Sequence, residues 1–151
     1  MPKDKKGHKN HIVHKMINQK TLHVGSHIMV NGVRARIESI GDADYIGYTT
    51  IDDSVIYIAD PSMSYVEPIP LTAQVLAEIG FEEKINCGIK VFQKLSDEKS
   101  VKFIYDGPGI WRCNCYADKD SVSRVGMARR ISYLHQAEQM LSVYGIELIK
   151  E

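Results

Sequence analysis

The order of hydrophobic and polar residues divides the chain into a stretch of short alternating runs followed by a stretch of mixed periods. Two β-rich runs flank Asn31-Gly32, a pair that tolerates the positive φ angles of a two-residue hairpin turn. Three further runs follow before Pro68, and Gly and Asp residues separate them. Strands this short would leave exposed edges, which closure into a barrel removes. We therefore predict a small SH3-like antiparallel β-barrel over residues 21–68.

The segment "PIPLTAQVLAEIGF" has the features of a strand end followed by a short helix. Pro68 and Pro70 cannot donate a hydrogen bond to a neighbouring strand. Thr72 suits the N-cap position, and the apolar residues after it fall on one helical stripe. Gly80 and Phe81 fit a Schellman ending, in which the glycine is left-handed and the next residue packs back onto the helix.

Three hydrophobic runs and a second helical pattern complete the chain. The runs "KINCGIKVFQKL", "SVKFIYDG" and "GIWRCNCY" are separated by turn signals and predict a three-stranded meander. The segment "RVGMARRI" fits either an edge strand or the start of a helix, and helical periodicity runs from Ile131 to Gly145. We predict an α-β-β-β-α unit over residues 69–151, packed on the barrel. The expected fold class is therefore α+β, an SH3-like barrel followed by a helix–three-stranded meander–helix unit.

The composition is that of a globular protein without a membrane segment. With 44% hydrophobic and 25% charged residues, the 151-residue chain is close to the average for soluble proteins. No apolar run approaches the ~20 residues needed to span a bilayer, and no secretory h-region follows the N-terminus. Three cysteines, an odd number, do not make a disulfide framework and fit a reducing compartment. We predict a cytoplasmic protein with no membrane partner.

Charge is distributed unevenly, although the formal net charge is zero. Residues 1–20 contain six lysines and one acid, whereas residues 21–151 contain 13 basic and 18 acidic residues. Dense positive charge with few apolar residues predicts a flexible basic arm over residues 1–20. The alternative is one turn of amphipathic helix near Ile12 and Met16, formed against a partner. The acidic body gives no overall field with which to hold a phosphate backbone.

Two groups of residues are candidates for a metal site. His8, His11 and His14 recur at every third position, but no carboxylate or thiolate lies at matched spacing nearby. Cys113 and Cys115 face the same side of a predicted strand, but one intervening residue is fewer than zinc knuckles use. The other interpretation is a polar tail and two buried structural cysteines. We therefore predict no metal site and no cofactor.

One pair of residues was a candidate for catalysis. His135 and Glu138 lie three residues apart on the predicted last helix and could form a general base with its orienting partner. The sequence contains no G-x-S-x-G elbow, no H-E-x-x-H motif and no cysteine in an activating motif. His135 also falls at the edge of the apolar stripe, where a structural role is common. We predict no catalytic residues, and hence a protein that is not an enzyme.

Aromatic and basic residues gather in and after the predicted meander. Trp and Arg carry much of the binding energy when they are central in an interface. The predicted partner-binding residues are Tyr105, Trp111, Arg112, Tyr116 and Arg124. The competing interpretation is that Trp111 fills the inner face of the meander. For nucleic acid, the alternative set adds Lys5, Lys6, Lys9, Arg129 and Arg130 to the Trp111/Arg112 face.

Three segments together resemble a known group of proteins. These are "LHVGSHIMVNGVRARIESI", "EPIPLT…VLAEIGF" and "ISYLHQAEQMLSVYGIEL", within residues 21–149. The chain resembles a family of small uncharacterised proteins from gut anaerobes and their phages and prophages. It differs from that family in the N-terminal arm, at Ala137 and Glu138, and in the "DGPGIWRCNCYADKD" region. The resemblance implies a mobile-element context and no particular activity.

These observations favour a binding protein. The leading hypothesis is a non-catalytic protein of phage or mobile-element origin that inhibits or adapts a host macromolecule, such as a CRISPR-type defence effector. Its partner would be a protein or a ribonucleoprotein. The alternative is an RNA- or DNA-binding module that uses the basic arm and the Trp111/Arg112 face. A third hypothesis is an enzyme or metal protein centred on His135 or the cysteines, and the oligomeric state stays open.

Overall fold

The structure is a computed structural model, and it describes residues 17, 19–41, 45–50 and 53–149. The chain divides into two compact units, Met1–Ile69 and Pro70–Glu151, called unit 1 and unit 2 below. Nearly all of the predicted basic arm, with His8, His11, His14, Lys5, Lys6 and Lys9, lies outside the described residues.

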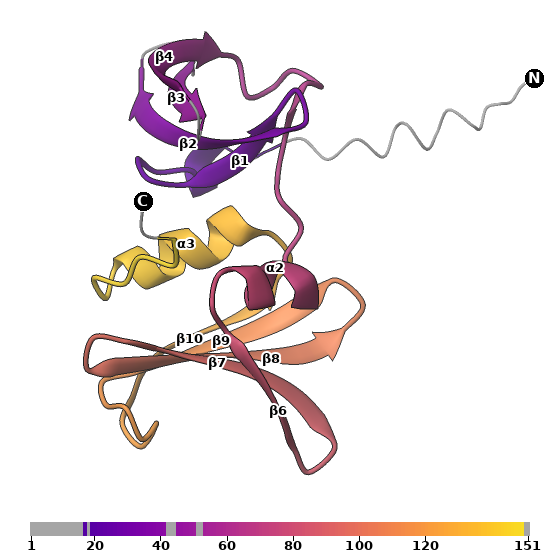
Figure 1. The fold of residues 1–151 in the computed structure, drawn as a ribbon, viewed down its shortest axis with the longest axis vertical. Helices are drawn as coiled ribbons and strands as arrows, with labels where there is room; N and C mark the ends of the chain where they lie inside the picture. Colours follow the sequence, from indigo (N-terminus) through magenta and orange to yellow (C-terminus); the bar gives the residue numbers. More distant parts are fainter. Residues whose placement is uncertain (1–16, 18, 42–44, 51–52, 150–151) are drawn as a thin grey trace, which may run out of the picture. The chain divides into compact units, whose positions relative to one another are not determined.

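Unit 1 contains an antiparallel sheet (Figure 1). Its strand order is β4-β3-β2-β1-β5. Val30 pairs with Val33 around Asn31 and Gly32, whose φ angles are 51° and 78°, so the predicted hairpin is confirmed. The elements are η1 (Gln19–Thr21), β1 (His27–Val30), β2 (Val33–Ile40), β3 (Ile46–Thr50), β4 (Asp53–Ala59) and β5 (Val66–Glu67).

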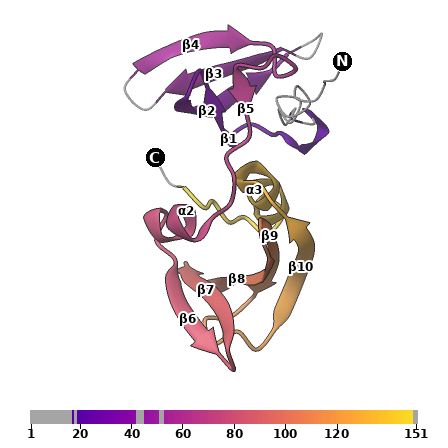
Figure 2. The same ribbon diagram turned by 90° about the vertical axis from the view of Figure 1, so that its right-hand side faces the viewer.

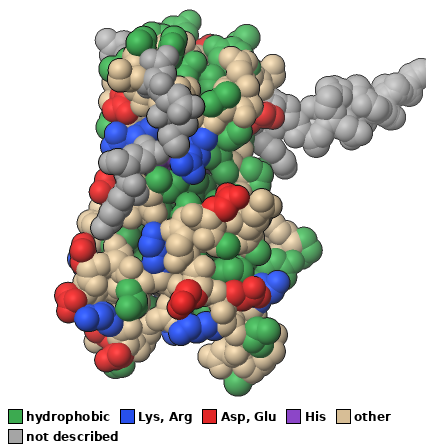
Figure 3. Space-filling view, viewed as in Figure 1, with side chains coloured by type: hydrophobic (Ala, Val, Ile, Leu, Met, Phe, Trp, Pro, Cys, Tyr) green, Lys and Arg blue, Asp and Glu red, His purple; other side chains and the backbone are tan. Residues whose placement is uncertain are grey.

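The predicted barrel is wrong, because the sheet of unit 1 is open. β5 has two residues and pairs with β1, while β4 forms the opposite edge, so no ladder within the described residues joins the two edges. Ile56 and Ile58 on β4 are more than half exposed, and hydrophobic side chains reach the surface over this part of unit 1 in Figure 3. The strand count was predicted well, but the sequence does not state which strands pair, and a two-residue β5 is too short to close the sheet.

Unit 2 contains a second antiparallel sheet and two helices. Its strand order is β10-β9-β8-β7-β6, so each strand pairs with its neighbours in sequence. Both helices lie on the same side of this sheet, and the other side carries none among the described residues (Figures 1 and 2). The elements are α2 (Ala73–Glu78), β6 (Glu82–Asn86), β7 (Ile89–Ser96), β8 (Lys99–Gly107), β9 (Ile110–Tyr116), β10 (Arg124–Ile131) and α3 (Leu134–Ser142).

The predicted helix–three-stranded meander–helix unit and the α+β class are therefore also wrong: the protein is mostly β, and the second sheet has five strands. The run "KINCGIKVFQKL" is a hairpin rather than one strand. It turns at Cys87 and Gly88, with φ angles of 52° and 80°, and a cysteine is not a usual turn signal. The ambiguous "RVGMARRI" segment forms the edge strand β10.

The local helix signals were interpreted correctly. The Thr72 side chain accepts a hydrogen bond from the Val75 main-chain N–H at 3.1 Å, as an N-cap does. Gly80 has a φ angle of +100°, and the Phe81 N–H donates to the Leu76 carbonyl. α3 begins at Leu134, three residues after the predicted start at Ile131, because that isoleucine still belongs to β10.

The core of unit 2 fills the helix side of its sheet. Phe81 meets Phe103 edge to face, with ring centroids 5.3 Å apart. None of the helices in the described part of the chain has the length and apolar character that crossing a membrane requires. Further buried residues of this unit are Leu76, Phe92, Val101, Trp111, Cys113, Cys115, Leu134, Leu141 and Ile146.

Candidate functional site

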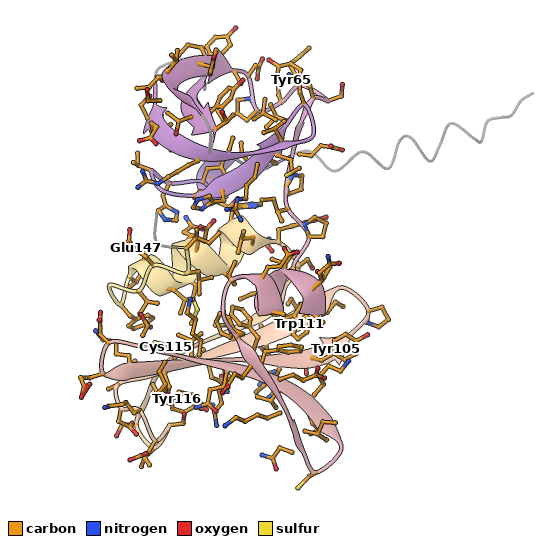
Figure 4. All side chains as sticks on the ribbon, in the orientation of Figure 1. Tyr65, Tyr105, Trp111, Cys115, Tyr116 and Glu147 are labelled. Atoms are coloured by element: carbon orange, nitrogen blue, oxygen red, sulfur yellow. The ribbon has the colours of Figure 1, made fainter. Side chains whose placement is uncertain are left out.

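Strand β9 presents two different sets of side chains on the two faces of the second sheet. Its odd-numbered residues from Trp111 to Cys115 are buried on the helix side. Arg112, Asn114 and Tyr116 alternate with them and face the side without helices. Figure 4 shows Trp111 and Tyr116 on opposite sides of the ribbon. We call the side without helices the open face.

Cross-strand pairing arranges the open face in rows, because directly paired residues in an antiparallel sheet point to the same side. The central row crosses all five strands and consists of Glu82, Gln93, Lys102, Asn114 and Met127. One flanking row is Leu95, Ser100, Tyr116 and Arg124. The other is Lys84, Val91, Ile104 and Arg112.

Asn114 is the buried polar residue at the middle of this face. Its side chain is 5% exposed, and its Nδ2 donates one long hydrogen bond of 3.4 Å to the Tyr116 hydroxyl. The Asn114 Oδ1 atom has no hydrogen-bond partner among the described residues. Rotating the amide by 180° would exchange Oδ1 and Nδ2. One of the two atoms would still be unpaired, because the Tyr116 hydroxyl can serve only one of them. A buried polar atom without a partner costs about 1–3 kcal/mol, so this position needs an explanation.

Positive charge collects around Asn114. The Lys102 Nζ lies 5.5 Å from the centroid of the Tyr116 ring, a cation–π contact, and Arg124 lies beside Tyr116 in the adjacent strand. Lys84, Lys102 and Arg124 make no ion pair with any described residue, whereas Arg112 pairs with Asp106 at 3.0 Å. Unit 2 has eleven basic and eleven acidic residues, so this face is more positive than its unit as a whole.

A shallow hollow of about 400 Å³ continues the open face toward β6. It lies at the edge of the sheet, and its lining combines open-face residues and Lys119 with two residues from the helix side: Glu82, Lys84, Gln93, Leu95, Lys119, Gly80 and Lys94. Most of these groups are polar, and both signs of charge are present. The hollow is therefore a continuation of the polar face rather than an apolar pocket of the kind that small hydrophobic ligands fill.

The loop between β9 and β10 is held at the end of the open face by hydrogen bonds. The Asp118 carboxylate accepts from the main-chain N–H groups of Val122 and Ser123, at 2.9 and 2.7 Å. These donors hold the pKa of Asp118 below its usual value. The fully buried Ser100 hydroxyl contacts the Asp118 carbonyl at 2.9 Å and the Ser121 hydroxyl at 2.8 Å. The polar groups beneath this loop are thus paired, unlike Asn114.

The structure divides the five predicted partner-binding residues between the two faces. Trp111 is 2% exposed and its Nε1 donates to the Leu71 carbonyl at 2.8 Å, while Tyr105 packs edge to face against it on the same side. Arg112, Tyr116 and Arg124 lie together on the open face.

Arg129 and Arg130, from the nucleic-acid alternative, are exposed in the irregular part of β10 beyond Ala128. Arg130 has a φ angle of +58°, a left-handed conformation that is uncommon for a residue with a side chain.

The candidates for chemistry lie elsewhere. His135 and Glu138 are both buried on α3, and the His135 ring stacks on Tyr133 with centroids 6.0 Å apart. Burial raises the pKa of the Cys113 and Cys115 thiols, so both stay protonated at neutral pH. Within the described residues, no group of three or more His, Cys, Asp or Glu side chains could hold a metal ion.

The central row contains residues that the sequence analysis missed, above all Lys102 and Asn114. The available signal was the alternation in "IWRCNCY". A strand that buries Trp111 and both cysteines on one face must turn its intervening residues to the other face. The pairing of Lys102 with Asn114 had no comparable signal, because it depends on the register between two strands.

Comparison with known proteins provides no relative from which a function could be transferred. No family model matches the chain, and neither a curated protein nor a solved structure matches it. The resemblance to proteins of gut anaerobes and their phages stays a prediction. The candidate site therefore depends on the geometry of the open face.

Proposed function

We propose that this protein is a non-catalytic binding protein that acts by occupying a host macromolecule, and that the open face of unit 2 is its contact surface. The observation that carries this proposal is the Asn114 Oδ1, which is buried without a partner at the centre of a polar row. An apolar residue at this position would avoid the cost of an unpaired amide. The oxygen is covered in the free protein, so a ligand that moves the neighbouring side chains aside and donates a hydrogen bond to Asn114 would offset that cost in the complex.

The positive charges support the same surface. Lys102 and Arg124 flank Tyr116, and both are without an ion-pair partner among the described residues. Cations at a surface that no nearby carboxylate neutralises attract an anionic partner and speed its association. Aromatic and arginine side chains are also the types that most often dominate binding energy.

The surroundings of the possible catalytic groups support a role without catalysis. Burial keeps the Cys113 thiol in its unreactive protonated form, and His135 lies enclosed on α3 rather than beside a nucleophile on the open face. The resemblance to proteins of phages and prophages favours a host macromolecule as the partner, with a defence effector as the natural class. Such a partner would be met in the cytoplasm.

Affinity capture from a host lysate tests this proposal. The bait proteins are the wild type, an open-face variant (Lys102→Gln with Arg124→Gln) and a control (Lys90→Gln with Lys99→Gln). The control removes the same charge from β7 and β8, at positions that alternate with the open-face residues. We expect a partner that the wild type and the control retain and the open-face variant loses. A set of retained partners that is identical for all three baits would refute the open face as the contact surface.

A further inference from the structure

We infer that the ligand of the open face is a single-stranded nucleic acid, with phosphates bound by Lys102 and Arg124 and a base held by Asn114 and Tyr116. This inference rests on the proposed function, since it names the partner class of the same face. Three features of the face lead to it, and they concern charge, hydrogen bonding and stacking.

The charged groups are suited to phosphates. Lys102 on β8 and Arg124 on β10 stand on either side of β9 in adjacent rows, so two cations border the Asn114 position. Lys84 extends the positive charge along the hollow next to β6. Each phosphate that such a side chain neutralises releases counterions, which gives binding with a strong dependence on salt.

Asn114 requires a ligand that offers more than negative charge. The amide carries both an acceptor and a donor, and a phosphate or carboxylate oxygen, which only accepts, could pair with the donor alone. Nucleobases carry N–H donors and acceptors on the same edge, and an asparagine amide pairs with such an edge in both directions. The long bond from Nδ2 to the Tyr116 hydroxyl is weak enough to be exchanged for a base.

Tyr116 adds an aromatic surface beside the amide. Its ring lies next to Asn114 on β9 and is partly exposed, while Lys102 already interacts with the ring. Aromatic rings on sheets stack on unpaired bases, and a base in a duplex does not offer its flat face. This feature favours a single strand over a duplex.

The composition of the face disfavours a protein as the direct ligand. Cores of protein–protein interfaces are depleted of charged residues. The middle of the central row is Gln93, Lys102 and Asn114, between Glu82 and Met127 at its ends, and Arg112 and Arg124 lie in the flanking rows. The exposed apolar side chains of this face, Leu95 and Met127, lie at the ends of their rows rather than at its centre, where protein partners bury their anchors.

Fluorescence anisotropy with purified full-length protein tests the inference. The probes are fluorescein-labelled oligouridine and oligodeoxythymidine of about 20 nucleotides, longer than the ~4–16 nucleotides that one small β-domain covers. We expect both the open-face variant and Asn114→Val to weaken binding by about tenfold or more. The open-face variant should reduce the slope of log K against log salt by about 1.4, since each lost phosphate contact accounts for about 0.7. Asn114→Val should leave that slope unchanged, because it removes no charge.

The Lys90→Gln, Lys99→Gln control lowers the net charge of the protein by the same amount as the open-face variant. It therefore separates binding at this site from general electrostatic attraction of the oligonucleotide, including attraction by the basic arm. Equal weakening in the control and the open-face variant would overturn the inference. Absence of oligonucleotide binding by the wild type would also overturn it. The lysate capture experiment, repeated with nuclease treatment, separates this inference from the proposed function. If partners are still captured after nuclease treatment and only the open-face variant loses them, the proposed function stands and the partner is a protein. Retention of the same partners by every bait refutes the open face as the contact surface.

Discussion

Replacing Asn114 by valine should make the protein more stable while it weakens ligand binding. The amide is 5% exposed and its Oδ1 is without a hydrogen-bond partner, which costs about 1–3 kcal/mol in the free protein. The hydrogen bond that the substitution removes is 3.4 Å long, so its loss costs at most about 0.5–1 kcal/mol. Valine also suits a strand better than asparagine. We expect Asn114→Val to raise the free energy of unfolding by about 1 kcal/mol.

Urea denaturation followed by tryptophan fluorescence measures this change. Trp111 is the single tryptophan of the chain and lies in the same unit, so its emission follows the unfolding of unit 2. Ser100→Ala is the matched control, because the Ser100 hydroxyl is equally buried but makes two short hydrogen bonds. We expect this control to lower the free energy of unfolding by about 1–2 kcal/mol. A similar loss of stability in Asn114→Val would show that Asn114 has a structural role, and the reasoning would fail.

Three other outcomes can be checked separately. Trp111→Ala should lower the free energy of unfolding by about 3–5 kcal/mol, measured by denaturation followed by circular dichroism. Trp111→Phe should lower it by about 1–2 kcal/mol, because this variant loses mainly the indole hydrogen bond to Leu71. A thiol reagent should label Cys87 alone in the folded protein, and Cys113 and Cys115 only after denaturation, as counted by mass spectrometry. The pKa of Asp118 is lower in the folded protein than in the unfolded chain, so its ionised carboxylate stabilises the fold at pH values above the usual pKa of aspartate. Asp118→Asn should therefore reduce Tm at neutral pH, and the difference from wild type should shrink as the pH falls below about 4.

Local signals in the sequence predicted local structure well. Asn31-Gly32 marks a hairpin because both residues tolerate positive φ angles, and both adopt them. Thr72 and Gly80 mark the two ends of α2 by the same kind of backbone requirement. The turn at Cys87-Gly88 was missed because a cysteine separates Asn86 from Gly88, and cysteine is uncommon at a turn position that needs a positive φ angle.

The arrangement of the strands was less accessible, because it depends on pairings between distant residues. The barrel prediction assumed that the edges of the first sheet must close, whereas the two-residue β5 leaves the sheet open. The open face shows the same limit. Alternation predicts that Asn114 faces away from Trp111, but its exposure, its pairing with Lys102 and its unpaired oxygen depend on neighbouring strands.

The central claim is that the open face of unit 2 contacts a single-stranded nucleic acid. The most direct measurement is a titration of ¹⁵N-labelled full-length protein with oligouridine, followed by ¹H–¹⁵N correlation spectra. We expect the Asn114 side-chain amide and the main-chain amides of Lys102, Tyr116 and Arg124 to shift together and saturate. Shifts confined to residues 1–20 or to unit 1, with the Asn114 amide unchanged at saturation, would contradict the central claim.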